Sequence, residues 1–453
     1  MQRTDSLKTK LTLLAVCLGF FMIIMDVTIT NVALPSIAKQ LGGDISMLQW
    51  VVNAYTLTFA GLLLSAGYLS DVYGAKKAFL YGIIAFTLSS IGCGFAPHTA
   101  VLIFFRLLQG ASAAVILPTT LSLIHSSYSD AQQRSKAIGI WAGIAGIGAT
   151  SGPIIGGILT SFFGWQAVFF VNVPIGIIVI LLTLKYVDCH EMKRKQQGFD
   201  IQGQLSGIIS MASLAYALVE AGQRGWFSTW VVVSFILFLV FLCVFLWTEW
   251  RSDAPMFPIE FFKIPTFSIA VLNGMIINLG FYGILFLLPL YFQSIRGYSV
   301  FLTGLAIIPQ PAFAALASYV SGRLVANVGT KLPIILGLFI AMLGEFLMLI
   351  TQHNAPSYWL LILPLSAIGF GCALAMPAAT IATIRTMPKG HTGIASSMFN
   401  TSRQIGGLIG VAVFGSLVNR ENNFVHGMHL SLIIAGSAAL FGCVITALFM
   451  KNK

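Results

Sequence analysis

Charged residues are scarce in this chain, since Asp, Glu, Lys and Arg make up only 9% of its 453 residues, whereas 57% are hydrophobic. A soluble domain carries about 25% charged residues, and a chain of this size cannot cover a water-exposed surface with so few. Intrinsic disorder is excluded as well, because disordered chains combine low hydrophobicity with high net charge. With a mean hydropathy of +0.90, the composition indicates a protein embedded in a membrane.

Patterns that carry metal or nucleotide chemistry are also missing. The six Cys residues form no CxxC pair, and the seven His residues fall in loops or at span ends without ligand partners, so no metal site is predicted. No GxxxxGK[ST] phosphate-binding loop occurs, which argues against direct drive by ATP. The longest stretches between apolar segments, near 188–200 and 250–266, are too short for a catalytic domain. We therefore expect neither an enzyme nor a cofactor.

Long apolar runs dominate what is present. A membrane-spanning helix needs roughly 20 predominantly apolar residues, and fourteen such stretches occur along the chain. They lie approximately at 11–34, 47–68, 78–96, 99–124, 136–160, 166–187, 201–221, 228–249, 267–292, 302–321, 332–351, 358–382, 393–418 and 430–450. The sequence thus predicts an all-α integral membrane protein with fourteen transmembrane helices.

The basic residues are distributed unevenly across these spans. With the N-terminus in the cytosol, nineteen Lys and Arg residues fall on the cytosolic side, four fall outside, and Arg106 and Arg403 lie within spans. This asymmetry obeys the positive-inside rule, so both termini are expected in the cytosol of a bacterial cell. The net charge of +11 then reflects topology, and no nucleic acid partner is expected. The first span is also too long for a cleaved signal peptide.

Two matching strings indicate an internal repeat. GYLSDVYGAKK (67–77) follows the second span, and GRLVANVGTK (322–331) follows the tenth. Matched loops in the two halves predict duplicated six-helix bundles, with the seventh and eighth spans inserted between them. We expect an N-terminal bundle at 1–188, two linker helices at 189–263 and a C-terminal bundle at 264–453.

Four motifs, taken in order, carry a family resemblance. Span 1 ends in MDVTITNVALP (25–35), the first loop fits G-x-L-x-D-x-x-G-x-K-K, span 4 contains R-x-x-Q-G, and span 5 contains G-x-x-x-G-P-x-x-G-G. The chain resembles the major facilitator superfamily and, within it, the fourteen-helix drug:proton antiporter family. Val72 and Ala75 depart from the loop pattern, because many members carry Arg at these positions.

Asp26 is the sharpest signal among the individual residues. A carboxylate within a span costs about 2.5–3.5 kcal/mol on insertion scales, so such residues usually face a cavity and carry protons or ions. We predict a site that takes up a proton and attracts a cation; a structural salt bridge is the alternative. Arg106 lies at a similar depth in span 4, and the resemblance implies a role in proton transfer, whereas a purely structural Arg bound to carbonyls is the other interpretation.

The resemblance assigns further roles to the motif residues. The first loop would act as a gate, through Asp71 together with Gly67, Gly74, Lys76 and Lys77. From composition alone Asp71 would be a solvated loop residue. The span 5 antiporter motif consists of Gly148, Gly152, Pro153, Gly156 and Gly157. Its glycines allow close helix packing, which would also seal a leak path in an exchanger.

Other polar residues at membrane depth are candidates for a substrate cavity. Together with Asp26 they are Asn31, Asn53, Tyr55, Gln109, Asn278, Tyr282 and Gln310. Glu345 and Arg403 are the remaining charges at this depth, and they form a candidate secondary charge pair. Glu345 is interpreted first as structural and second as another proton site.

The sequence therefore predicts a monomeric, proton-coupled antiporter that exports lipophilic drugs by alternating access, driven by the proton gradient. With Asp26 as the single strong cavity carboxylate, monocationic, zwitterionic or neutral drugs are expected in preference to dications. Export of a dedicated metabolite, such as a siderophore, amino acid or lipid, on the same fold is the first alternative. A membrane sensor or enzyme without transport activity is the remote one.

Overall fold

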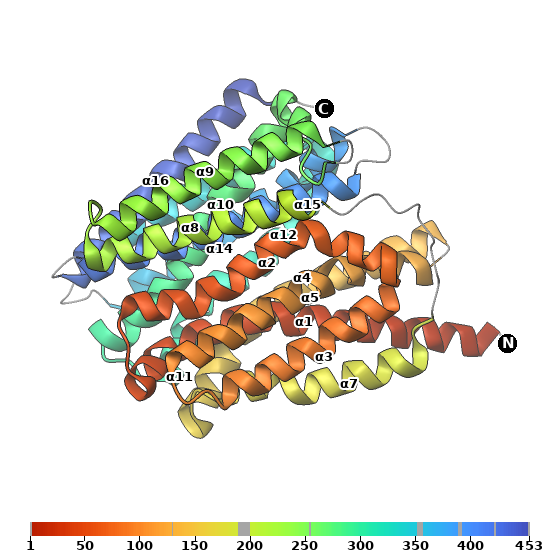
Figure 1. The fold of residues 1–453 in the computed structure, drawn as a ribbon, viewed down its shortest axis with the longest axis horizontal. Coiled ribbons are helices and arrows are strands. Elements are labelled where there is room, and N and C mark those ends of the chain that lie inside the picture. Colours follow the sequence, from red (N-terminus) through yellow and green to blue (C-terminus); the bar gives the residue numbers. More distant parts are fainter. Residues whose placement is uncertain are drawn as a thin grey trace.

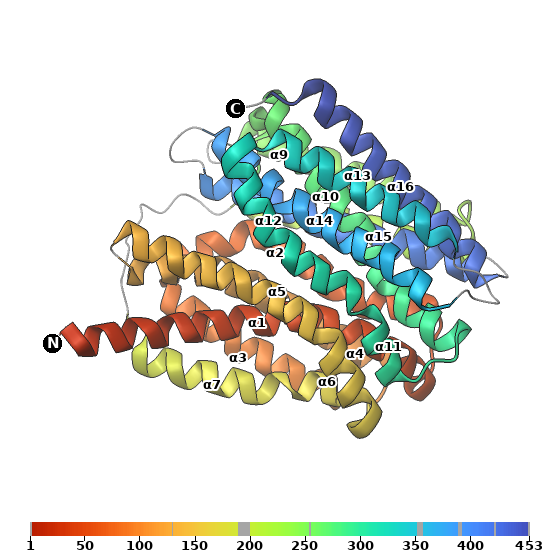
Figure 2. The same ribbon diagram turned by 180° about the vertical axis from the view of Figure 1, so that it is seen from behind.

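The computed structural model describes residues 2–128, 130–188, 200–252, 255–350, 357–387, 392–420 and 423–451. All regular secondary structure in this part of the chain is helical, and the helices form one bundle (Figures 1 and 2). The all-α fold class predicted from the apolar runs is confirmed.

The first half of the chain supplies seven helical segments. They are α1 (Gln2–Leu41), α2 (Ile45–Tyr73), α3 (Ala75–Gly94), α4 (Thr99–Ser127), α5 (Ala131–Phe163), α6 (Ala167–Phe170) and α7 (Asn172–Tyr186). Helix starts carry the expected caps: the Asp44 carboxylate accepts a hydrogen bond from the Met47 amide at 2.9 Å, and that of Asp130 accepts one from Gln133 at 2.8 Å. Such side chains satisfy amides that have no partner within the helix.

The rest of the chain continues from α8 to α16. Its α-helices are α8 (Ile201–Arg224), α9 (Thr229–Arg251), α10 (Pro265–Leu290), α11 (Val300–Ile307), α12 (Pro309–Val328), α13 (Lys331–Leu347), α14 (Trp359–Arg385), α15 (Thr392–Arg420) and α16 (Phe424–Phe449). Short helical turns of other types occupy η1 (Ile259–Lys263), η2 (Tyr291–Ile295) and η3 (Met348–Ile350).

Thirteen spans among the described residues are long and apolar enough to cross a membrane. Two of them are broken helices, since α6 and α7 meet at Val171 and α11 gives way to α12 at Pro309. Helix α2, 29 residues long, is the fourteenth segment of membrane-spanning length. Helix α1 continues to Leu41 instead of ending near residue 34, because hydrophobicity marks the membrane-embedded part and not the end of the helix.

The helices pack as two groups. In the first, α2 and α3 contact α4, while α1 contacts α5 and α7. In the second, α10 contacts α15, while α12 and α13 contact α14. The groups meet where α2 lies against α15, α5 against α11 and α12, and α1 against α10.

The inserted helices bridge the two groups on one face of the molecule (Figure 1). Helix α8 packs against both α2 and α15, and α9 packs against α8. The Gln204 amide of α8 donates a hydrogen bond to the Gly61 carbonyl of α2 at 2.5 Å and accepts one from Ser65. This polar contact ties the inserted hairpin to the first group.

The two groups are closest at one end of the bundle. We call the end where α1 begins and α16 finishes the termini end, and the opposite end the far end. In the far half, Gln49 of α2 donates to the Val411 and Ala412 carbonyls of α15 at 3.0 and 2.6 Å, and Gln293 donates to the Val32 carbonyl at 3.1 Å.

At the termini end the groups separate. The ribbons of α5 and α12 diverge toward it (Figure 2), and a Cβ added at Gly139 or Gly143 of α5, or at Gly322 of α12, would meet nothing within 4 Å. All three glycines are exposed. The two groups therefore make their contacts in the far half, and their helices separate toward the termini end.

Candidate functional site

The carboxylate of Asp26 lies in the interior of the first helix group, with 0% of the residue exposed. Its Oδ2 accepts a hydrogen bond from Arg106 Nη1 at 2.5 Å. Its Oδ1 accepts one from Gln109 Nε2 and one from Asn172 Nδ2, both at 2.8 Å. Helices α1, α4 and α7 thus place one cation and two amide donors around a single carboxylate, which does not face lipid.

Arg106 is also buried, with 1% of the residue exposed, and it has several partners besides Asp26. Its Nε donates to the Val51 carbonyl of α2 at 3.0 Å, and its Nη1 also donates to Gln109 Oε1 at 2.7 Å. The guanidinium carbon lies 4.4 Å from the centre of the Tyr55 ring, a cation–π distance. All these partners come from α2 and α4, so the guanidinium also ties these two helices together.

Gly110 in the R-x-x-Q-G motif explains how α2 comes near enough to bind Arg106. A Cβ at Gly110 would overlap the Tyr55 carbonyl and the Thr58 hydroxyl of α2. Without a side chain at this position, α2 and α4 approach each other closely, and the Val51 carbonyl reaches Arg106. The motif therefore combines a charge, an amide and the small residue that lets the neighbouring helix dock.

Two residues of this site were not singled out from the sequence. Asn172 begins α7, directly after the break at Val171, and its amide donates to Asp26 and, at 3.3 Å, to Ser90 Oγ. Ser90 of α3 also accepts from Gln109 Nε2 at 2.8 Å. The sequence did offer a sign of Asn172, since it is a polar amide inside the apolar span 166–187. Polar groups inside spans usually have a partner.

The antiporter motif of α5 packs against two different helices. Gly148, Gly152 and Gly156, spaced four residues apart, face α1, where added Cβ atoms would meet Ile24, Thr28 and Ile29. Gly157 faces α11 of the other group, and a Cβ on Gly304 of α11 would overlap the Pro153 carbonyl. The motif thus sits at the closed far half of the interface between the groups.

The predicted cavity residues are mostly enclosed in this conformation. Asn31, Asn53, Tyr55, Gln109, Asn278 and Gln310 are at most 2% exposed, and Tyr282 is half-buried. Gln109 belongs to the Asp26 site. In the others several polar atoms have no partner among the described residues, namely Asn31 Oδ1, both amide atoms of Asn53 and of Gln310, Tyr55 Oη and Asn278 Nδ2.

Such atoms are informative because a buried polar group without a hydrogen bond costs roughly 1–3 kcal/mol. They come from α1, α2, α10 and α12, which belong to both helix groups. Tyr55 and Tyr282, one from each group, lie within electrostatic range of each other. The interior thus offers hydrogen-bonding capacity that the protein itself does not use.

The candidate pair of Glu345 and Arg403 is not formed. Glu345 of α13 lies beside Gly280 of α10, where an added Cβ would come within 2.5 Å of Glu345 Oε1. Arg403 of α15 donates instead to Asn400 Oδ1 at 3.2 Å, with its guanidinium 5.9 Å from the Phe399 ring centre. The interpretation as a salt bridge is wrong, because depth in two spans does not determine which faces meet.

The residues predicted to gate are only partly described. The backbone of 67–73 forms the last turns of α2, so Asp71 belongs to a helix and not to a loop; its side chain and Gly67 lie outside the part of the structure described at side-chain level. Gly74 makes the turn into α3 with a φ of +83°, a value that favours glycine. Lys76 donates to the Leu184 carbonyl at 3.4 Å, and Lys77 is exposed.

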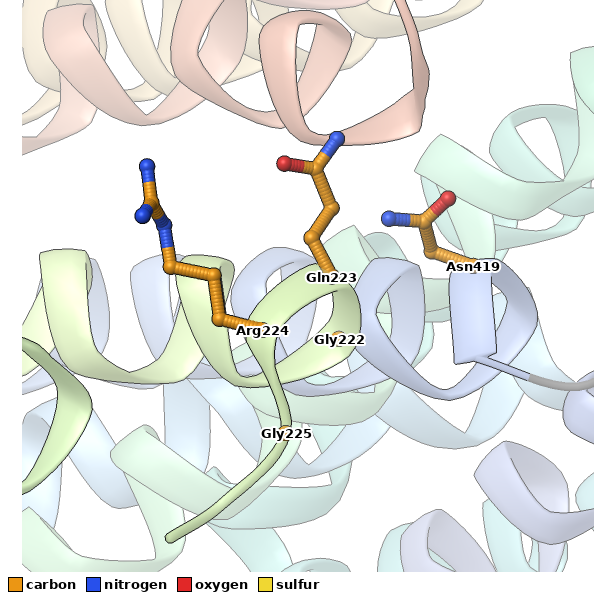
Figure 3. Close-up of a pocket in the computed structure, with 5 residues that line it drawn as sticks. All are labelled: Gly222, Gln223, Arg224, Gly225 and Asn419. Carbon is orange, nitrogen blue, oxygen red and sulfur yellow. The ribbon is translucent and has the colours of Figure 1, made fainter. Parts of the chain in front are cut away.

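A cavity of about 640 Å³ opens elsewhere, at the far end of α8. Gly222, Gln223, Arg224, Gly225 and Asn419 line it (Figure 3). Arg224 already pairs with Glu220 at 2.5 Å, and none of these residues belongs to the Asp26 site. Within the described residues, no group of three or more His, Cys, Asp or Glu side chains could hold a metal ion.

Comparison with known proteins places this arrangement in a family. The family model described as the Major Facilitator Superfamily matches residues 16–411. The chain is 38% identical over 410 residues to the multidrug resistance protein Stp of Mycobacterium tuberculosis, covering 90% of this chain and 75% of that protein. It is 33% identical over 433 residues to the methylenomycin A resistance protein of Streptomyces coelicolor, covering 96% and 90%.

Solved structures agree at the level of the fold. An auto-inhibited POT family peptide transporter superposes with a TM-score of 0.73 at 14% identity, covering 98% of each chain. A bacterial homologue of the human lysosomal transporter Spinster, in an inward-facing conformation, gives a TM-score of 0.69 at 16% identity. With the family match and these relatives, the chain belongs to the major facilitator superfamily and is a membrane transporter, not an enzyme.

Proposed function

We propose that this transporter exports lipophilic drugs in exchange for protons, with Asp26 as the proton-carrying group. The observation that carries the proposal is the buried Asp26–Arg106 pair. A buried ion pair is a poor device for stability alone, because desolvation offsets much of the attraction. Ionisable groups inside membrane spans are usually functional, and relatives at 30–38% identity are named for resistance to drugs and antibiotics.

The pair provides a charge switch that needs no direct contact between Asp26 and the substrate. While Asp26 is ionised, its charge and that of Arg106 cancel. When Asp26 takes up a proton, Arg106 remains as one uncompensated positive charge. At about 8 Å and an effective dielectric constant near 20, this charge repels a cationic substrate by about 2 kcal/mol, which favours its release.

This arrangement refines the expectation that Asp26 attracts the cation itself. Arg106, Gln109 and Asn172 surround the carboxylate, so a substrate cation reaches it only if they move. We infer that the unpartnered amides and hydroxyls of Asn31, Asn53, Tyr55, Asn278 and Gln310 bind the cargo instead. Neutral and monocationic drugs fit such a polar, uncharged site better than dications.

The proposed cycle alternates the side to which the interior opens. We assign the termini end to the cytosol, since the positive-inside rule favours it, and the first and second bundles to 1–188 and 264–453, with 189–263 as the linker. Substrate enters from the cytosol or the inner leaflet while the far end is closed. Rocking of one bundle against the other then exposes Asp26 to external protons.

The test is drug efflux by cells or proteoliposomes that contain the wild type or Asp26→Asn, with and without a protonophore. Wild-type efflux of several unrelated dyes is expected to stop with the protonophore. Asp26→Asn, which cannot lose a proton, is expected to reach the membrane in normal amounts and to lose proton-driven efflux. Undiminished drug resistance in that variant would refute the assignment.

Asp44→Asn is the matched control. It makes the same change at an exposed helix cap, where Asn also caps well, and it is expected to leave efflux intact. A panel of chemically unrelated dyes also separates the two transport functions. Efflux of one compound class alone would favour a dedicated metabolite exporter on the same fold.

A further inference from the structure

Glu345 is a second carboxyl group in the membrane interior, and the proposed switch does not use it. It is 2% exposed, and no hydrogen bond or ion pair joins it to another described residue. Its Oε2 is among the buried atoms without a partner. Its situation is thus the opposite of that of Asp26, which accepts three hydrogen bonds.

Among the described residues, no cation forms an ion pair with Glu345. Gly280 of α10 has no side chain, which leaves the room that Oε1 occupies. Ala435 of α16 lies near the same place, 3.7 Å from a Cβ added at Gly280. The Cys372 thiol of α14 lies within electrostatic range of Glu345. Residues 344 and 346 of α13 pack against Ile368 of α14 and Gly436 of α16, so the carboxyl lies within the core of the second bundle.

The internal repeat relates this place to the Asp26 site. The matched loops after the second and tenth spans pair α1 with α10, α3 with α13, α4 with α14, and α7 with α16. Asp26 of α1 accepts hydrogen bonds from Arg106 and Gln109 of α4 and from Asn172 of α7. Ser90 of α3 joins the site through Gln109. Glu345 of α13 lies among α10, α14 and α16. Each bundle therefore holds one carboxyl group among its four corresponding helices.

We propose that Glu345 is a second proton-binding site, so that one transport cycle carries two protons. An ionised carboxylate without a partner is strongly disfavoured inside a protein, so Glu345 is protonated in the conformation seen here. A polar or cationic cargo that enters the interior from the cytosol then brings water or its own charge to the carboxyl group, and the proton leaves. The inference rests on the proposed proton-coupled export and adds to its stoichiometry.

The proposal predicts a measurable charge movement. Exchange of a monocation for one proton moves no net charge, whereas exchange for two protons moves one. We would reconstitute the wild type, Glu345→Gln, Asp26→Asn and the control Glu220→Gln, whose carboxylate pairs with Arg224 at the far end of α8. Tetraphenylphosphonium export would be measured under an imposed inside-negative membrane potential without a pH gradient. One net charge per cycle supports about a fifty-fold cation gradient for each 100 mV.

The wild type and Glu220→Gln are expected to build this gradient, and Glu345→Gln is expected to lose it while still responding to a pH gradient. If Glu345→Gln builds a potential-driven cation gradient as large as that of the wild type, Glu345 is not a second proton site. The same holds if the wild type builds no such gradient. Coupling that persists in Asp26→Asn overturns the proposed function instead, so the two failures are distinguishable.

An infrared measurement decides the matter without any substrate. The purified wild type is expected to show the C=O band of a protonated carboxylic acid that disappears on alkaline titration, and Glu345→Gln is expected to lack it. Gln has nearly the shape of protonated Glu, so this variant keeps the packing against Gly280. Identical spectra of the two proteins over the titration would contradict the proposal.

Discussion

At the scale of single residues, the Asp26 site shows how a membrane protein holds charge in its interior. The carboxylate has a cation and two amide donors, and the cation has a carbonyl and an aromatic ring in addition. Because nearly every donor is used, each residue supports the others. Removing one member therefore does more damage than the loss of a single contact.

This interdependence can be tested with a double-mutant cycle. Arg106→Ala leaves the Asp26 charge buried and uncompensated, and we expect it to lower stability by about 3–5 kcal/mol. In Arg106→Ala/Asp26→Asn neither charge remains, so the double variant is expected to be more stable than Arg106→Ala. Thermal unfolding of the purified proteins in detergent measures both effects. Losses of Arg106→Ala and of Asp26→Asn alone that add up to the loss of the double variant would show that the two residues do not act as a pair.

At the scale of helices, glycine decides which elements approach each other. In α5, glycines recur every fourth residue from Gly148 to Gly156 on the side that touches α1, whereas Gly157 touches α11. Gly110 similarly lets α2 dock on α4. The inserted helix α8 instead uses polar contacts from Gln204, and it bridges α2 and α15, which belong to different groups.

A pair of matched substitutions in α5 tests the role of close packing. A Cβ at Gly156 would lie 2.9 Å from the Ile29 carbonyl of α1, whereas a Cβ at Gly139 would meet nothing. We expect Gly156→Ala to destabilise the protein by about 1–3 kcal/mol through overpacking and to impair efflux. Gly139→Ala removes a helix-interior glycine and is expected to be neutral or stabilising.

Thermal unfolding and dye efflux of the two variants provide the measurement. A Gly156→Ala protein with wild-type stability and efflux would mean that α5 and α1 do not need this close approach.

At the scale of the whole molecule, the two helix groups touch along the far half and separate toward the termini end. This asymmetry is the form expected of one state in an alternating cycle. The unpartnered polar atoms of the interior come from both groups, so a cargo bound there would sense their relative position. The proposed switch at Asp26 lies within the first group and would move with it.

Spin labels on exposed positions report this motion. Labels at Gly139 of α5 and Gly322 of α12 span the two groups at the termini end. We expect a long distance and, when pH or substrate is changed, a second population with a shorter one. Labels at Gly139 and Lys77 lie in the same group, so their distance is expected to stay constant. Double electron–electron resonance measures both pairs, and a single unchanging distance for the first pair would argue against rocking.

The sequence by itself determined the membrane location, the helical class and the approximate spans, because hydrocarbon demands long apolar segments whose backbone groups are satisfied within a helix. It also pointed to Asp26 and Arg106, since charges at that depth are costly and rare. It did not distinguish the gate segment at Asp71 from a loop, because the helix of α2 continues beyond the apolar residues.

Only the tertiary structure decided which of these groups meet. Asp26 and Arg106 are 80 positions apart, and their pairing depends on how α1 and α4 rotate, as does the separation of Glu345 from Arg403. Asn172 and Ser90 entered the site for the same reason. Depth along a helix follows from counting residues, but the facing side is fixed by packing against neighbours, and packing is a property of the assembled bundle.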